Sequence, residues 1–486
     1  MRSLISLFRQ VTHRGLKSLK THRLQMGEKG YPYRRYPYRL KGFGLLAIAL
    51  IGLTLLIHPG PEPQEQIQAD IVSSQQIPPS ATPLSPLGAP STGTPKVPKP
   101  PSEIRGVWIT NVASNVLFAP WGIPRAINQL ADMHFNTVYP VVWNRGKTFY
   151  HSPTLKQLTG QPIEPLMALT HPTEDPLREM VRLGHRKQLR VIPWFEYGFM
   201  VPLNSKLARQ HPDWLTTRQN GSFRLQEETF EAAFEEGAND KAAQKKTPRG
   251  LAKLLNSGAP TELGWLNPLH PSVQALMLNL AQEVVSQYDV DGIQFDDHFS
   301  LPVDFGYDPY TVSLYRAEHQ GQSPPTNPAD EDWIRWRAGK LSSFVKDLHS
   351  AVKTACPTCL ISLSPNPAKF AYRFHLQDWR TWVENDWLDE LVVQVYRDDL
   401  YRFEGELAKN TLQATMDRIP VSIGILTGTW RRPISFEQIQ AQVVSSRNHH
   451  FSGVSFFYWE TLWSYFTPES PQQRRRNFRA LLEAVS

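Results

Sequence analysis

The chain has 486 residues, more than the roughly 100 to 200 residues of a typical domain, so we expect one large domain with appended segments. Its net charge of +7 is concentrated at the start: residues 1–42 hold eleven Lys or Arg and one Glu, which leaves a net charge of −3 for residues 43–486. Nucleic-acid binding requires a basic patch on a folded domain, so this distribution argues against a nucleic-acid partner.

The first 57 residues have the pattern of a membrane anchor. Residues 1–42 are basic, and residues 43–57 form an apolar run without a charge. This run is short for a bilayer span, and the core of a signal peptide would also fit it. The basic leader is long for a cleaved signal, so we predict an uncleaved, single-pass signal anchor. By the positive-inside rule, residues 1–42 are then a cytoplasmic tail, and the rest of the chain lies on the periplasmic or extracytoplasmic side of the inner (plasma) membrane.

Residues 58–102 are rich in Pro, Ser, Gln and Thr and show no apolar periodicity. This composition predicts a disordered, extended linker. We therefore expect the folded domain to occupy residues 103–486, tethered to the membrane by its linker.

From residue 103 onward, strand-like and helix-like patterns alternate. The predicted strands are Ile104–Thr110, Asn136–Trp143, Arg190–Tyr197, Asp291–Phe299, Leu360–Ser364, Glu390–Tyr396, Pro420–Leu426 and Gly453–Trp459. Amphipathic helices are predicted at Ile123–His134, Pro176–Gln188, Ser272–Tyr288, Trp333–Lys353, Phe436–His449 and Gln472–Ala484. Eight strand–helix repeats predict an α/β fold of the (β/α)8 TIM-barrel type, with a doubly wound sheet as the alternative.

Two connections are long, residues 202–266 after the third strand and residues 301–332 after the fourth. Both leave from carboxyl ends of strands, so we expect both to cover the active face of the barrel. We assign no function to residues 226–259 within the first connection beyond shaping or covering the cleft.

Cys356 and Cys359 lie between a predicted helix and the fifth strand, on the face opposite the expected active site. A redox Cys-x-x-Cys usually opens a helix, and a zinc site needs more ligands than these two. We predict a structural disulfide or two unreactive thiols.

The fourth strand, residues 291–299, ends in Asp296, Asp297 and His298. Because successive side chains of a strand face opposite sides, we expect only one of the two aspartates to face the barrel mouth. The same divergence argues against a shared metal site. We expect His298 to hydrogen-bond to a carboxylate or to a sugar hydroxyl.

Acids and aromatic residues also cluster at other predicted strand ends, a combination that suits sugar rings. Cleavage of a glycosidic bond needs a pair of carboxyl groups and no cofactor. We predict Asp296 as the primary catalytic carboxylate, Asp297 as its support, and Asp398 or Glu460 as the second acid, with Glu196 as a rival. The predicted substrate-binding residues are Trp143, Asn144, Arg145, Trp194, Glu196, His298, Asn366, Gln394, Tyr396 and Trp459.

Several segments resemble the glycosyl-hydrolase-like family 10 of bacterial envelope proteins, namely residues 103–110, 135–143, 191–198, 211–215, 265–268, 291–299 and 394–396. The resemblance implies a TIM-barrel glycoside hydrolase that acts on cell-wall (peptidoglycan-type) or other envelope glycans. The fourth strand also resembles the Asp-Gly-x-x-x-Asp motif of α-amylase-type and α-galactosidase-type barrels, whose last Asp, the nucleophile, corresponds to Asp296. The predicted seventh strand ends without a carboxylate, unlike many barrel glycosidases.

The sequence thus predicts a membrane-anchored, exported glycoside hydrolase. Two alternatives stay open. One is an envelope protein that binds glycans without cleaving them, and the other is a metal-dependent polysaccharide deacetylase.

Overall fold

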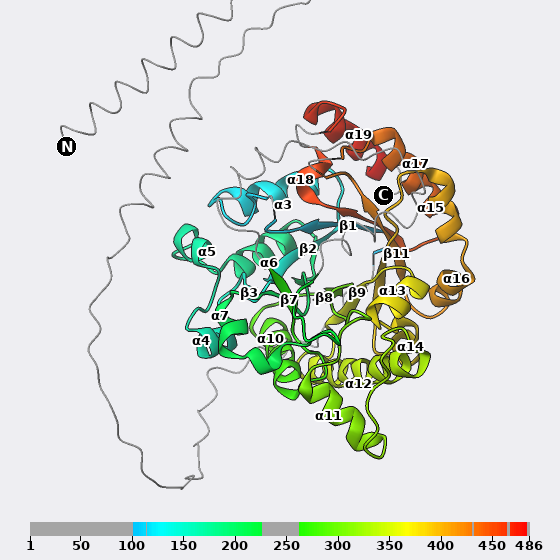
Figure 1. Ribbon diagram of the computed structural model, residues 1–486. Coiled ribbons are helices and arrows are strands. Elements are labelled where there is room, and N and C mark those ends of the chain that lie inside the picture. Colours follow the sequence, from blue (N-terminus) through cyan, green and yellow to red (C-terminus); the bar gives the residue numbers. More distant parts are fainter. Residues whose placement is uncertain (1–100, 113, 226–261, 430–431, 464–466, 484–486) are drawn as a thin grey trace, which may run out of the picture. The chain divides into compact units, whose positions relative to one another are not determined.

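The computed structural model describes residues 101–112, 114–225, 262–429, 432–463 and 467–483. These residues build a closed parallel barrel (Figure 1). In chain order its strands are β1 (Ile104–Ile109), β2 (Thr137–Asn144), β4 (Arg190–Val191), β5 (Trp194–Phe195), β8 (Gly292–Asp296), β9 (Leu360–Ser364), β10 (Glu390–Gln394), β11 (Val421–Leu426) and β12 (Gly453–Phe457). Strands β4 and β5 both pair with β2 and share one position in the barrel. Strand β1 pairs with both β12 and β2, which closes the barrel. The predicted TIM barrel is confirmed over the doubly wound sheet.

Helices surround the strands in Figure 1. They are α3 (Gly122–Asp132), α4 (Pro153–Thr159), α5 (Pro165–Thr170), α6 (Pro176–Arg186), α7 (Lys206–Gln210), η1 (Pro212–Trp214), α10 (Pro271–Gln287), α11 (Pro309–Glu318), α12 (Glu331–Ala355), α13 (Ala368–His375), α14 (Trp379–Glu384), α15 (Leu400–Leu407), α16 (Asn410–Met416), α17 (Phe436–Asn448), α18 (Trp459–Leu462) and α19 (Pro471–Glu483). All six predicted helices are present, with ends shifted by a few residues.

The barrel strands are apolar runs because helices cover them outside and side chains fill them inside. Every residue of β2 and of β11 is buried. The third barrel position is the irregular one. Ile192 and Pro193 separate β4 from β5, and the pairing of β5 with β2 shifts between Val141 and Trp143. A proline lacks the N–H that a regular ladder needs, and such irregularities re-aim the residues that follow.

The two long connections meet at the carboxyl end of the barrel. In the first, β6 (Met200–Pro202) pairs antiparallel with β7 (Leu263–Trp265). Asp308 from the second connection accepts hydrogen bonds from Thr216 Oγ1 (2.8 Å) and Asn267 Nδ2 (3.0 Å) of the first. The predicted covering of this face is confirmed for the described residues. The segment 226–259 lies outside them.

Cys356 and Cys359 form a disulfide between α12 and β9, with their Cα atoms 5.4 Å apart. This is the first of the two predicted states. The predicted basic tail, the anchor and all but the last two residues of the linker lie outside the described residues. Within the described ranges, none of the helices combines the length and apolar character that a membrane span requires.

Candidate active site

The site is built around the end of β8. The strand stops at Asp296 and turns there, with Phe299 N donating to Asp296 O (3.1 Å). His298 Nδ1 consequently lies 3.3 Å from Asp296 Oδ1 and 3.4 Å from Asp297 Oδ1. The expectation that only one aspartate faces the mouth is wrong, because strand alternation no longer applies after the last residue of the strand. One possible metal-ligand atom from each of Asp296, Asp297 and His298 lies within 4.8 Å of the other two.

Asp297 is oriented by amides from the ends of β9 and β10, the next two strands of the barrel. Asn366 Nδ2, after β9, donates to Asp297 Oδ2 (3.0 Å). Gln394 Nε2, at the end of β10, donates to Asp297 Oδ1 (3.1 Å) and to Ser364 O (2.8 Å). Two predicted substrate-binding residues therefore fix the position of a predicted catalytic one.

Glu196 follows β5, the neighbour of β8 in the barrel. The residue is 4% exposed, and its carboxylate accepts hydrogen bonds from Thr110 Oγ1 (2.7 Å) and Asn144 Nδ2 (2.8 Å). Burial disfavours the charged carboxylate, and the nearby charge of Asp296 adds to this effect. Together they raise the pKa of Glu196 to about 7 in spite of the two hydrogen bonds. The structure thus brings a second carboxyl group from another strand into electrostatic contact with Asp296.

His298 carries the positive charge of the site. Burial by itself would lower the pKa of the imidazole, but the carboxylates of Asp297 and Asp296 outweigh it and raise the pKa to about 9. The ring lies against Tyr197, with centroids 4.8 Å apart. At neutral pH the imidazolium occupies the place between the two carboxylates that a cation would take.

Among the described residues, Asp296, Asp297 and His298 are the group whose side-chain atoms lie close enough together to hold a metal ion. The argument that neighbouring residues diverge is therefore wrong here. A histidine binds metal through a neutral ring nitrogen, so a metal would have to displace the proton that both carboxylates stabilise.

Gly198 lets the loop after β5 pass close to the loop after β8. A Cβ atom on Gly198 would lie 2.3 Å from His298 O, and the residue has φ of +36°. Phe199 N donates to the same carbonyl (3.2 Å), and Trp143 Nε1 donates to Gly198 O (2.7 Å). Trp143 is fully buried, so it supports this crossing of loops and has no face open to a sugar.

The two predicted second acids have hydrogen-bond or ion-pair partners outside the Asp296 cluster, although Tyr458 interacts electrostatically with both Glu460 and Glu196. Asp398 is half exposed, comes four residues after the end of β10, and pairs with Arg432 (2.7 Å). Glu460 lies in the first turn of α18 and accepts a hydrogen bond from Ser114 Oγ (2.8 Å). In the described residues neither forms a hydrogen bond with Asp296 or Asp297, whereas Glu196 interacts electrostatically with Asp296. The strand alternation used to place Asp398 ended at Gln394 with the strand itself.

Aromatic rings from several strands meet inside the barrel. Trp194 lies 6.3 Å from Phe457 between ring centroids, and Tyr396 lies 5.8 Å from Phe457. Burial, Asp297 and Asp296 together raise the pKa of the Tyr396 hydroxyl, so this ring borders the carboxylates. Trp194 Nε1 is buried without a hydrogen-bond partner in the described part of the chain. Trp459 packs edge-on against Trp463, with ring centroids 5.0 Å apart. Its role in substrate binding stays a prediction.

Comparison with known proteins identifies the lineage of this barrel. The profile of the family described as Glycosyl hydrolase-like 10 matches residues 103–239 and 238–445, which is more than half of the chain. The chain belongs to the Glycosyl hydrolase-like 10 family.

The relatives of this family member are distant. Glycosyl hydrolase DigH of Escherichia coli (strain K12) is 22% identical over 387 residues, covering 67% of this chain and 72% of DigH. The glycoside hydrolase domain of PgaB (BpsB) from Bordetella bronchiseptica has a TM-score of 0.50 at 14% identity, covering 79% of this chain and 99% of that one. The catalytic domain of β-amylase from Paenibacillus polymyxa has a TM-score of 0.51 at 9% identity, covering 80% and 100%. The two solved structures establish the fold that this chain shares with them.

The structure of this Glycosyl hydrolase-like 10 member also reveals site residues that were not predicted. Thr110, which holds Glu196, directly follows β1, and its position as the last residue of a predicted strand was a usable signal. Gln377, between α13 and α14, donates to Asp296 O (3.0 Å) and Phe299 O (3.1 Å) and so braces the turn. No local pattern marks Gln377, because its role depends on how α13 folds back over β8.

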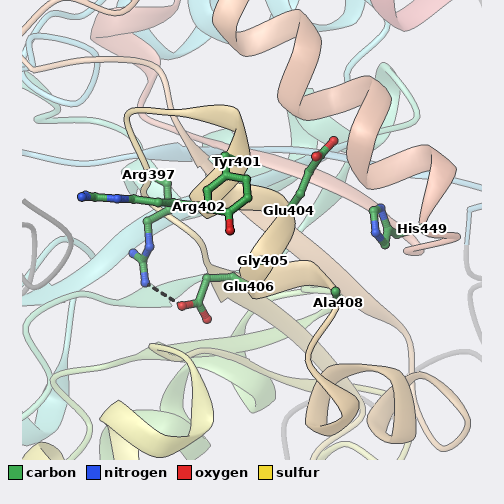
Figure 2. A pocket seen from close by; sticks show the side chains of 8 residues that line it. All are labelled: Arg397, Tyr401, Arg402, Glu404, Gly405, Glu406, Ala408 and His449. Carbon is green, nitrogen blue, oxygen red and sulfur yellow. Dashed lines mark hydrogen bonds and ion pairs between the residues drawn. The ribbon is translucent and has the colours of Figure 1, made fainter.

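A separate hollow of about 790 Å³ lies between α15 and the end of α17 (Figure 2). Its lining residues are Arg397, Tyr401, Arg402, Glu404, Gly405, Glu406, Ala408 and His449. The ion pair between Arg397 and Glu406 (3.2 Å) crosses it. Glu196, Asp296 and Asp297 do not line this hollow. The candidate active site is therefore the barrel mouth, where these three carboxyl groups lie.

Proposed function

We propose that this protein is a glycoside hydrolase in which Glu196 donates a proton and Asp296 is the partner carboxylate. The observation that carries the proposal is the buried Glu196 carboxyl beside Asp296, with a pKa of about 7. A carboxyl group with this pKa is protonated in about half of the molecules at neutral pH. It can therefore give its proton to a leaving oxygen near pH 7, as a general acid must.

In the proposed reaction, the proton of Glu196 passes to the glycosidic oxygen as the bond to the anomeric carbon breaks. Positive charge then develops on the sugar ring, and the Asp296 carboxylate stabilises it. The leaving sugar departs as an alcohol, water bonds to the anomeric carbon either directly or after a covalent bond to Asp296, and the proton that the water loses passes to one of the two carboxylates. Asp297 supports this arrangement, because Asn366 and Gln394 fix its position beside His298. Trp194 and Tyr396 would offer ring surfaces to the sugar at the base of the mouth.

The proposed substrates are peptidoglycan-type glycans of the bacterial cell wall or other envelope glycans. Two features support them. The sequence predicts a signal anchor that would hold the barrel on the outer side of the inner membrane. The disulfide between Cys356 and Cys359 is of the kind that persists in oxidising compartments outside the cytoplasm.

The decisive experiment measures release of reducing ends by the purified protein from peptidoglycan glycan strands, chitin-like oligomers and α-glucans. We expect activity on one of these classes, and we expect Glu196→Gln and Asp296→Asn to abolish it. Asp398→Asn and Glu460→Gln are matched controls that remove a carboxylate while leaving the proposed pair in place. If the protein binds glycans but releases no ends, the glycan-binding alternative is correct. Release of acetate that a chelator stops would establish the deacetylase instead.

A further inference from the structure

Two bulky residues at the barrel mouth adopt the left-handed backbone conformation. Among the described residues, eight non-glycine residues have positive φ. Six of them come one or two residues after a helix end, where this conformation is common: His134, Gln188, Gln320, Leu376, Asp386 and His450. The other two are Arg145 (φ +51°) and Tyr197 (φ +60°), which follow strands. Strain of this kind at a strand end points to a function for the side chains that it aims.

The strained backbone of Arg145 belongs to a tight turn. Strand β2 pairs antiparallel with β3 (Lys147–Thr148), with Asn144 opposite Lys147, so Arg145 and Gly146 form the two-residue turn. Asn, Asp and Gly are preferred in such a turn, because both positions require positive φ. An arginine is unfavourable there, and the turn itself gives no reason for its presence.

The turn aims the guanidinium at the candidate active site. Arg145 Cζ lies 4.3 Å from the centroid of the Tyr197 ring, and the same ring lies against His298. The residue before Arg145, Asn144, donates to Glu196 Oε2 (2.8 Å). The backbone of Arg145 therefore adjoins the residue that binds Glu196, and its guanidinium lies on the ring that contacts His298.

The charge of Arg145 has no carboxylate partner in the described ranges. Two arginines in other connections are paired: Arg218 with Asp304 (2.5 Å) and Arg432 with Asp398 (2.7 Å). Arg145 forms no such ion pair. Its side chain hydrogen-bonds with Tyr197, but its Nε is buried without a hydrogen-bond acceptor. A buried donor without an acceptor is unfavourable, whereas a carboxylate would satisfy Nε and a terminal nitrogen together.

We propose that Arg145 forms a subsite for a carboxylate carried on a sugar ring of the bound glycan. The inference rests on the proposed function for its ligand class and adds a residue that selects acidic over neutral glycans. One negative charge suits the site, because a single guanidinium balances it, while a dianion would be repelled by Asp296 and Asp297. The carboxylate can belong to the lactyl ether of a muramic-acid-type sugar or to a uronic acid.

The test measures binding by the full-length chain carrying Glu196→Gln, which prevents turnover, with and without Arg145→Gln. The probes are soluble peptidoglycan glycan oligomers with free lactyl carboxylates, the same oligomers with these carboxylates converted to methyl amides, hexuronic-acid oligomers and neutral chitin oligomers. We expect Arg145→Gln to weaken binding of one carboxylate-bearing probe by about 10- to 100-fold, and amidation to have a similar effect. The probe that responds identifies the source of the carboxylate.

The two changes should not add, because both remove the same interaction. Arg145→Lys should restore part of the affinity, since it keeps the charge but not the planar fork. Lys147→Gln removes an exposed cation from the same turn and is the matched control, with binding unchanged. Thermal unfolding of each variant verifies that it is folded.

The proposal is overturned if Arg145→Gln weakens binding of amidated and free oligomers equally, or if neither carboxylate-bearing probe responds. Because binding is read without bond cleavage, these outcomes are separate from a failure of the proposed function. A wild-type protein that binds the acidic probe through Arg145 but cleaves no glycan would refute hydrolysis and leave the subsite in place.

Discussion

Replacing Glu196 by Gln tests both the chemistry and the electrostatics of the site. Glutamine keeps the size of the side chain and an oxygen that can accept from Thr110 and Asn144, but it has no proton to donate. General acid catalysis contributes about 100- to 10,000-fold to rate, so we expect kcat/KM to fall by at least about 100-fold. In the wild type, kcat/KM should decline as pH rises through about 7, where Glu196 loses its proton.

The same substitution should change how stability depends on pH. The difference between a pKa of 4.5 and one of about 7 corresponds to about 3 kcal/mol. Because the folded-state pKa is raised, this stabilisation is present below pH 4.5 and is lost as pH rises through about 7. Glutamine does not titrate, so the stability difference should shift in favour of the variant by about 3 kcal/mol between pH 4 and pH 8.

Two assays read these effects: reducing-end release against pH, and urea unfolding at pH 4 and pH 8 for wild type and variant. Asp398→Asn is the control, since it removes a carboxyl group that is paired with Arg432 and not hydrogen-bonded to the Asp296 cluster. A Glu196→Gln protein that retains most of its activity with the same decline near pH 7 would refute the assignment of the proton donor. An unchanged stability difference across the two pH values would refute the raised pKa.

Three further outcomes follow from the geometry. Gly198→Ala should destabilise the protein by about 2 kcal/mol or more and reduce activity, because its methyl group would overlap His298 O, and circular dichroism should show an intact barrel at low temperature. An Ala variant as stable as the wild type would disprove the tight approach. The stability that His298 contributes should be present below pH 6.5 and lost as pH rises through about 9, so unfolding of wild type and His298→Gln should converge at alkaline pH; parallel curves would contradict the ion pairing. Activity should survive a chelator, because the proton on His298 occupies the place of a cation. Loss of activity in the chelator would show that a metal binds at these three residues.

The sequence alone determined the barrel. Strands buried on both faces must be apolar throughout, and the helices between them must alternate apolar and polar faces, so both periodicities are written locally in the chain. The same local signal placed Asp296 at a strand end and marked the long connections at residues 202–266 and 301–332 as covers of the active face. Asn366 and Gln394 were also identified in this way, because they lie at strand ends that meet at one edge of the barrel.

Only the tertiary structure decided which of these residues act together. The alternation of side chains along a strand predicts which side of the sheet a residue faces only up to the last residue of the strand. Asp297 and Asp398 come after the ends of β8 and β10, so the alternation did not place them correctly. Glu196 meets Asp296 because β5 pairs with β8 as consecutive barrel strands, a neighbour relation between residues about a hundred positions apart. Its raised pKa arises from burial and from that neighbour, and neither is a property of the residues adjacent to it in the chain.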